Sequence, residues 1–320
     1  MKTCLSGIAL AIMLAASSAC AQSYPSKPIR IIVPFPPGGI ADVICRVFAQ
    51  KFTDAWNQPV VVDNRPGAGG NIGADLIAKA PPDGYTIGIG SIGTHAVNMS
   101  LFSKMPYDSV KDFAPVVLVM EADGLLALHP SVPVKSVKEL IALARARPGQ
   151  LTYASAGNGT ASHLAGELFR ASAKIDIVHV PYKGNVPALT DLVGGQTSML
   201  FATMPTVLPL VKAGKLRALA VTGAHRNPAA PEYPAMAETL PGFDVTNWIG
   251  IFAPAGTPAD IVAKLNAEIT RVMTLPETQT RLAGEGAKFT PNTPADFAAF
   301  QKREIAKWAK VIREAGLHAD

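Results

Sequence analysis

The chain has 320 residues, of which 48% are hydrophobic and 17% charged, and its formal net charge is +5. This composition supports extensive burial and excludes an intrinsically disordered protein. The basic residues are scattered, and their densest group alternates with Glu304 and Glu314, so a nucleic-acid-binding stripe is also excluded. The mild positive charge instead favours small anionic ligands.

The first 21 residues have the pattern of a secretory signal peptide. Lys2 precedes a short apolar stretch over residues 5–16, and an Ala-Cys-Ala sequence ends at Ala21. We expect cleavage after Ala21 and a periplasmic mature chain, with a lipoprotein anchored through Cys20 as the alternative. Only Cys45 remains after cleavage, so we expect no internal disulfide and a buried thiol at this position.

Short apolar segments alternate with helical segments from Ile29 onward. This alternation predicts an α/β fold with mostly parallel sheets flanked by helices. Predicted strands cover residues 29–34, 60–63, 86–90, 116–120, 125–129, 151–155, 177–180, 199–202 and 216–221. Predicted helices cover residues 42–52, 72–80, 137–145, 162–171, 188–194, 206–213, 259–273 and 295–314.

Two segments, residues 121–124 and 246–250, are predicted to cross between two lobes. Each is followed by the same succession of strand, proline turn and helix. The first lobe is then discontinuous and comprises residues 22–122 and 247–320, while residues 123–246 form the second lobe. Ligands of open α/β sheets bind beyond the carboxyl ends of the strands, so we expect a ligand cleft between the lobes.

A strand, a glycine-rich loop and a helix start recur along the chain. The loops read PPGGIAD at residues 36–42, SIGTH at 91–95 and SAGNGT at 155–160. A helix that starts after such a loop presents unpaired backbone N–H groups and the positive end of its dipole. Because these loops occur in both lobes, they predict two jaws that bind a small anion between them.

The candidate ligand-binding residues come from these loops and from the ends of two further strands. They are Phe35, Gly38, Gly39, Ile40, Ala41, Asp42, Ser91, Thr94 and His95 in the first lobe, and Ser155, Ala156, Gly157, Asn158, Gly159, Thr160, His163, Tyr182, Phe201, Ala202 and Thr203 in the second. For Asp42 we favour a structural role as a helix cap and partner of Arg46. For His95 and His163, structural and ligand-binding roles both remain open.

Other chemistries have less support in the sequence. The GIGSIG segment at residues 88–93 matches a dinucleotide-binding pattern, but it lies in the third strand–helix unit and lacks the acidic residue that should close a later strand. The histidines lack metal-ligand spacing, so we expect neither a metal nor another cofactor. An exported hydrolase using Ser155 and His163 is the enzymatic alternative, although Tyr153 replaces the first glycine of a nucleophile elbow. We expect no catalysis.

Several long motifs together carry a family resemblance. They read YPSKPIRIIVPFPPGGIADVICR, VVVDNRPGAGGNIGADLIAKAPPDGYTI, LTYASAGNGTASHLAGELF, HVPYKGNVPALTDLVGGQ and WIGIFAPAGTP. Through these motifs the chain resembles the Bug family, the periplasmic receptors of tripartite tricarboxylate transporters. The resemblance implies a two-lobed type II periplasmic-binding fold in which residues 36–41 and 155–160 hold a carboxylate, while residues 93–95 and 201–203 select the rest of the ligand.

The resemblance also implies a function and a partner. We expect a monomeric receptor that captures a small organic mono- or dicarboxylate, aromatic acids included, and delivers it to the permease subunits of such a transporter. A carboxylate sensor for a signalling system is the alternative. Ile40 and Ala41 depart from the family pattern, in which Ser or Thr is frequent in this loop, and the departure favours a more apolar acid.

Overall fold

The structure is a computed structural model that describes residues 24–284 and 286–318. The predicted signal peptide lies outside the described residues. Within the described ranges, no helix combines the length and the apolar character that crossing a membrane requires.

The strands and helices alternate along the chain, as the sequence predicts. The strands are β1 (Ile29–Val33), β2 (Val60–Asn64), β3 (Thr86–Ser91), β4 (Phe113–Leu128), β5 (Thr152–Ser155), β6 (Val178–Pro181), β7 (Met199–Thr203), β8 (Arg217–Val221), β9 (Thr246–Pro254) and β10 (Ala287–Lys288). The helices are α2 (Ile40–Trp56), α3 (Asn71–Ala78), α4 (Asn98–Leu101), α5 (Val137–Ala146), α6 (Ala161–Ala173), α7 (Asn185–Val193), α8 (Met204–Lys212), α9 (Ala259–Met273), α10 (Pro276–Gly284) and α11 (Pro294–Ala315), with short helical turns η1 (Ala68–Gly70), η2 (Gly93–Val97) and η3 (Met236–Glu238).

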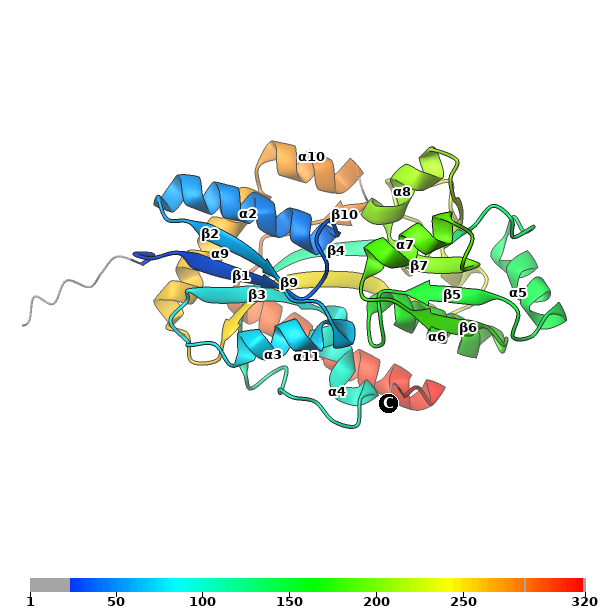
Figure 1. The fold of residues 1–320 in the computed structure, drawn as a ribbon, viewed down its shortest axis with the longest axis horizontal. Coiled ribbons are helices and arrows are strands. Elements are labelled where there is room, and N and C mark those ends of the chain that lie inside the picture. Colours follow the sequence, from blue (N-terminus) through cyan, green and yellow to red (C-terminus); the bar gives the residue numbers. More distant parts are fainter. Residues whose placement is uncertain (1–23, 285, 319–320) are drawn as a thin grey trace, which may run out of the picture.

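Strand β4 joins two groups of strands. The strand order is β2-β1-β3-β9-β4-β7-β5-β6, and β8 and β10 also pair with β4. Up to Asp123, β4 pairs with β9, and from Gly124 onward it pairs with β7 and β8. We call β1, β2, β3, β9 and β10, with the helices α2–α4 and α9–α11, the turns η1 and η2 and the loops between them, the first half. The strands β5–β8, with the helices α5–α8, the turn η3 and their loops, form the second half (Figure 1).

The course of β4 differs from the prediction of two separate strands. Residues 121–124 continue the strand instead of separating two strands, and Asp123 pairs with Thr246 of β9. Gly124 lies within the strand, and a Cβ at this position would lie only 2.8 Å from Oγ1 of Thr222. This glycine therefore permits a close approach between neighbouring segments within the sheet.

The sheet combines parallel and antiparallel pairs. The pairs β1–β2, β1–β3, β5–β6 and β5–β7 are parallel, as expected for strands joined through helices. Every antiparallel pair among the described residues involves β4 or β9, the long strands that pass between the two halves. The parallel prediction therefore holds for β1–β3 and for β5–β7, and the pairs made by β4 and β9 add the antiparallel part.

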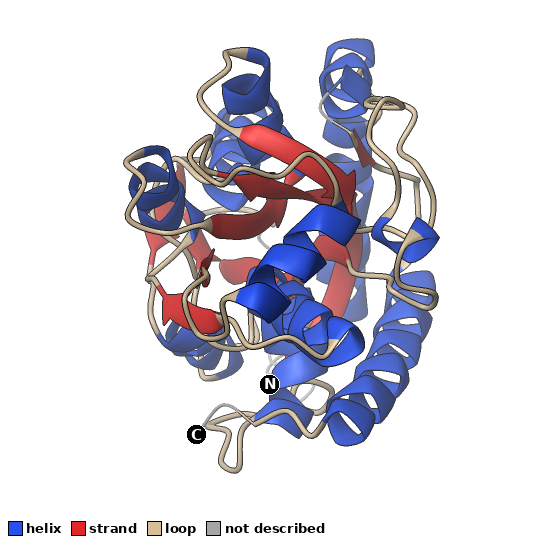
Figure 2. Cartoon of the chain, turned by 90° about the vertical axis from the view of Figure 1, so that its right-hand side faces the viewer, coloured by secondary structure: helices blue, strands red, loops and turns tan. Residues whose placement is uncertain are grey.

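Helices pack around the strands (Figure 2), and their apolar faces are buried. In α2, the buried positions Ile44, Cys45, Phe48 and Phe52 recur at helical spacing and share one cluster with Ile31 of β1. Burial also raises the pKa of the Cys45 thiol, which keeps this side chain protonated and inert.

Candidate ligand-binding site

A cavity of about 80 Å³ lies between the two halves. Its walls are the starts of α2, α6, α7 and α8 and the end of β3, and residues of β4 and β9 complete it. No residue that lines it carries a charged side chain. An anion in this cavity would therefore depend on backbone N–H groups, hydroxyls and amides.

Half of the predicted site residues line this cavity. They are Phe35, Gly39, Ile40, Ala41, Ser91, Ala156, Thr160, Phe201, Ala202 and Thr203. These residues come from all three glycine-rich loops and from the end of β7, so the structure brings the predicted loops to one place.

The start of α2 forms one side of the cavity. Gly38 has a φ of +86°, which favours glycine, and Gly39 precedes the helix with an extended backbone (φ −78°, ψ 165°). No side chain caps this end of α2. The backbone N–H groups of the first turn are therefore available to a ligand, at the positive end of the helix dipole.

Asp42 follows in the first turn of α2, but its side chain is buried behind the cavity. Its Oδ2 accepts hydrogen bonds from the Gly38 backbone N–H and from Nε of Arg46, each at 2.9 Å. Burial by itself would raise the pKa of Asp42, but the hydrogen bonds from Arg46, Gly38 and Asn64 together hold it below its ordinary value. Asp42 thus holds the loop that precedes α2 in place, which is a structural role of the kind that we favour from the sequence.

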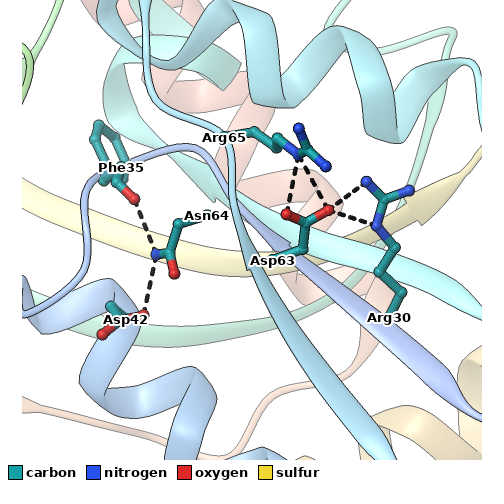
Figure 3. Close-up of polar contacts among 6 residues, drawn as sticks. All are labelled: Arg30, Phe35, Asp42, Asp63, Asn64 and Arg65. Carbon is teal, nitrogen blue, oxygen red and sulfur yellow. Dashed lines mark hydrogen bonds and ion pairs between the residues drawn. The ribbon is translucent and has the colours of Figure 1, made fainter.

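Asn64 connects the same loop to the end of β2 (Figure 3). Its Nδ2 donates to Oδ1 of Asp42 and to the carbonyl oxygen of Phe35, each at 3.0 Å. The neighbouring Asp63 pairs with Arg30 and Arg65. Both arginines are therefore engaged with an aspartate, and neither lines the cavity.

The start of α6 forms the opposite side of the cavity and repeats the α2 geometry. Gly159 has a φ of +78°, and Thr160 precedes the helix with an extended backbone (φ −77°, ψ 161°). The Thr160 hydroxyl does not cap the helix but donates to the carbonyl oxygen of Gly157 at 2.6 Å. Nδ1 of His163 accepts a hydrogen bond from the Gly159 N–H at 3.2 Å. His163 is therefore bound to the backbone behind the lining.

The starts of α7 and α8 also lack side-chain caps. Gly184 precedes α7, and Thr203, which precedes α8, shares a hydrogen bond with Thr206 at 2.8 Å instead of capping the helix. Four helices thus direct uncapped N-termini toward the same cavity.

Ser155 lies behind the lining and pairs with a different histidine from the one the hydrolase alternative requires. Its Oγ lies 2.6 Å from Nε2 of His179 and accepts a hydrogen bond from the Gly157 N–H. Burial, and secondarily the neighbouring His163, lowers the pKa of His179 to about 4. The Ser155–His163 pair of the hydrolase alternative is thus absent from the hydrogen bonds of the described residues.

Thr94 and His95 also lie behind the lining. Oγ1 of Thr94 lies 2.8 Å from Nδ1 of His95, and the His95 ring stacks on Phe252 with centroids 3.9 Å apart. Burial lowers the pKa of His95 to about 3, so this histidine is neutral. His95 therefore packs in the aromatic core of the first half, where it cannot contact a ligand in the cavity.

Tyr182, Gly157 and Asn158 face neighbouring segments instead of the cavity. The Tyr182 hydroxyl donates to Oδ2 of Asp191 at 2.7 Å, and burial together with this bond raises the pKa of Tyr182 to about 12. Gly157 and Asn158 lie against Gly69 of the first half.

Several residues that line the cavity were not predicted individually. They are Pro36, Ile92, Gly124, Ala161, Ser162, Ala165, Asn185, Val186, Thr222, Val245, Asn247 and Ile249. Asn185 follows a glycine after a strand, so the pattern of the other loops could have found it. Thr222, Val245 and Asn247 carry no local motif, because the pairing of distant segments brings them to the cavity.

No group of three or more His, Cys, Asp or Glu side chains in the described ranges is placed to hold a metal ion. The chemistry that this cavity offers is hydrogen bonding from neutral groups.

Comparisons with known proteins agree with this geometry. The model of the tripartite tricarboxylate transporter family receptor matches residues 44–317. Protein BugT of Bordetella pertussis is 39% identical over 97% of this chain and 96% of its own length.

Two solved structures share the fold across nearly their whole length. One is an R. palustris protein with adipate, at 38% identity and a TM-score of 0.89, covering 92% of this chain and 99% of that one. The other is MatC of Rhodopseudomonas palustris with bound malate, at 35% identity and a TM-score of 0.87, covering 90% of this chain and all of that one. The chain has the two-lobed α/β fold of periplasmic binding proteins, and it belongs to the tripartite tricarboxylate transporter family of receptors.

Proposed function

We propose that this chain is a periplasmic receptor that captures a small organic carboxylate and delivers it to the permease of a tripartite tricarboxylate transporter. The observation that carries the proposal is the meeting of uncapped helix N-termini from both halves at one cavity without charged side chains. Backbone N–H groups at a helix start bind carboxylates well, because the hydrogen bonds are charge-assisted and the dipole favours an anion. The relatives with adipate and malate support the same ligand class.

The division into lobes belongs to this proposal. Residues 22–122 and 247–320 would form one lobe and residues 123–246 the other, with β4 and β9 as the connections about which the lobes close. Binding of a ligand by both jaws would favour the closed arrangement through its contacts with each. The receptor would act as a monomer and without catalysis.

The apolar part of the lining limits which acids fit the cavity. Phe35, Ile40, Ile92, Phe201 and Val245 surround the cavity, and a fully hydroxylated acid would leave polar groups unpaired against them. An acid with an apolar body, aliphatic or aromatic, fits these walls better.

The test is a thermal-shift and calorimetric screen of the mature chain. Adipate, malate and benzoate are compared with neutral analogues of the same shape, with adipamide as the match for adipate. We expect at least one acid to raise the midpoint of unfolding while its neutral analogue does not, because a ligand stabilises the state that binds it. If sugars or metal ions stabilise the protein and no carboxylate does, the proposal is wrong.

A further inference from the structure

The two halves also touch each other beside the cavity, and the contact is made by glycines. A Cβ at Gly93 would lie 2.6 Å from the carbonyl oxygen of Gly159, and a Cβ at Gly184 would lie 2.6 Å from Cδ of Pro36. A Cβ at Gly69 would lie closer still to the carbonyl oxygen of Asn158. Each of these contacts joins the first half to the second.

Gly93 differs from the other contact glycines in its backbone. Gly69 and Gly184 have positive φ values, at which any side chain is strained, whereas Gly93 lies in the helical turn η2 without one. The three atoms nearest to a Cβ at Gly93 all belong to Gly159 and Thr160 of the second half. An alanine at this position therefore fits its own half and meets an obstacle only in the other half.

The contact is continuous with the cavity lining. Gly93 directly follows Ser91 and Ile92, which line the cavity. Thr160 of the second half faces Gly93 across the contact and also lines the cavity. A separation at Gly93 would therefore also move the start of α6 away from the start of α2.

The contact also contains a buried oxygen without a hydrogen bond. A Cβ at Gly159 would collide with Oδ1 of Asn98, and this oxygen has no partner among the described residues, although Nδ2 of the same side chain donates to Oδ1 of Asn71. A buried unpaired acceptor costs free energy that hydration recovers when the surface opens. The contact therefore opposes its own formation slightly, which suits a state that must form and separate.

We propose that Gly93, with Gly69 and Gly184, is a positioning residue for ligand capture: the absence of a side chain there lets the two halves approach until the starts of α2 and α6 flank one ligand. The capture step rests on the function proposed above, but the steric contact does not. In Gly93→Ala the closed arrangement is disfavoured, and the apparent affinity falls in proportion to its lost population.

The test measures closure without any ligand. Spin labels are placed on cysteines introduced at the exposed positions Gln50 of α2 and Lys212 of α8, while the buried Cys45 stays unlabelled. We expect a short-distance population in the wild type, because the contacts at Gly93, Gly69 and Gly184 let the halves approach each other, and a reduced one in Gly93→Ala. The matched control is Gly194→Ala, whose Cβ would meet only ordinary contacts within the same half.

A second pair of variants guards against a folding defect in the first. Gly69→Ala and Gly214→Ala impose nearly equal backbone strain, at φ values of +64° and +69°, but only Gly69 lies at the contact, and Gly214 has open space around it. Of these two variants, we expect only Gly69→Ala to reduce the short-distance population.

Adipate serves as the ligand probe, and we expect Gly93→Ala to bind it at least about tenfold more weakly than Gly194→Ala. A wild type without the short distance, or contact variants that keep it undiminished, would overturn the inference. Failure of the wild type to bind adipate bears on the proposed function alone, because the distances are measured without ligand.

Discussion

The turns that start α2 and α6 lie on opposite sides of the cavity and have nearly the same backbone. In each, a glycine with positive φ is followed by an extended residue, and the third helical residue accepts a hydrogen bond from the N–H of that glycine. That third residue is Asp42 in α2 and His163 in α6. The same backbone thus carries an anionic side chain in one half and a neutral one in the other.

Because of this difference, the starts of α2 and α6 differ in their local charge. The Asp42 carboxylate offsets part of the positive end of α2 and is itself paired with Arg46. Burial lowers the pKa of His163, so this side chain is neutral near pH 7, and the first turn of α6 contains no acidic residue. The α6 side therefore offers the stronger attraction to a carboxylate, and the α2 side offers a more rigidly anchored loop.

The largest expected effect comes from placing a fixed anion at the α6 start. In Ala161→Asp, the new carboxylate would lie within roughly 4 Å of a bound one, a repulsion of about 4 kcal/mol at an effective dielectric constant of 20. Adipate affinity should fall at least about 100-fold. The same charge should stabilise the helix start by about 0.3–1 kcal/mol, so unfolding midpoint and affinity should move in opposite directions.

The control for this variant is Ala295→Asp, which adds the same charge to the first turn of α11, at an exposed position away from the cavity. Calorimetry should find its adipate affinity unchanged. Equal losses in both variants would show that net charge, not the α6 start, governs binding.

The second effect is a difference in how His163 and Asp42, one in each turn, make the stability of the protein depend on pH. The folded pKa of His163 lies below the 6.5 of the unfolded chain, so the unfolded chain binds the proton first and stability is lost as pH falls below 6.5. The folded pKa of Asp42 lies below 3.8, so its contribution is lost only below that pH. Each group can change stability by up to about 1.4 kcal/mol per pH unit.

Urea unfolding at stepwise pH should therefore give different profiles for His163→Gln and Asp42→Asn. His163→Gln should reduce the loss of unfolding free energy between pH 6.5 and about 4. This window reports on His163 and His179 together, because the centroids of the two rings lie 4.4 Å apart. The second should leave that window unchanged and alter the profile only at lower pH. The opposite assignment of windows would refute the comparison.

The smallest effects concern helices whose starts are capped. Ser136 caps α5 and Thr293 caps α11, each by accepting a backbone hydrogen bond in the first turn. Replacing either residue with alanine should lower the unfolding free energy by about 1 kcal/mol. Adipate affinity should not change, because neither helix start lines the cavity. A variant that binds more weakly would link these caps to the site.

The local parts of this arrangement could be read from the sequence. Glycine-rich loops after apolar strands signal the starts of α2 and α6, because backbone conformation there depends on neighbouring residues. Where a side chain points, in contrast, depends on partners far along the chain. Ser155 pairs with His179, 24 residues further along the chain, and His95 stacks on the distant Phe252, so neither side chain reaches the cavity although both loops do.

The connecting strands were the least predictable part. The sequence places Gly124 in a crossing between two strands, but in the structure it belongs to the single strand β4, and Asn247 reaches the cavity only because β9 pairs with β4. Such positions depend on the assembled sheet, which no short window of sequence contains.

The lack of a charged side chain in the cavity lining has a consequence for how this receptor can diverge. Binding through main-chain N–H groups does not depend on the side chains that surround the ligand, so substitutions at Ile40, Phe201 or Asn247 can reshape the space around the ligand without removing those groups. New preferences among organic acids can then be acquired in single steps, without an intermediate that binds nothing.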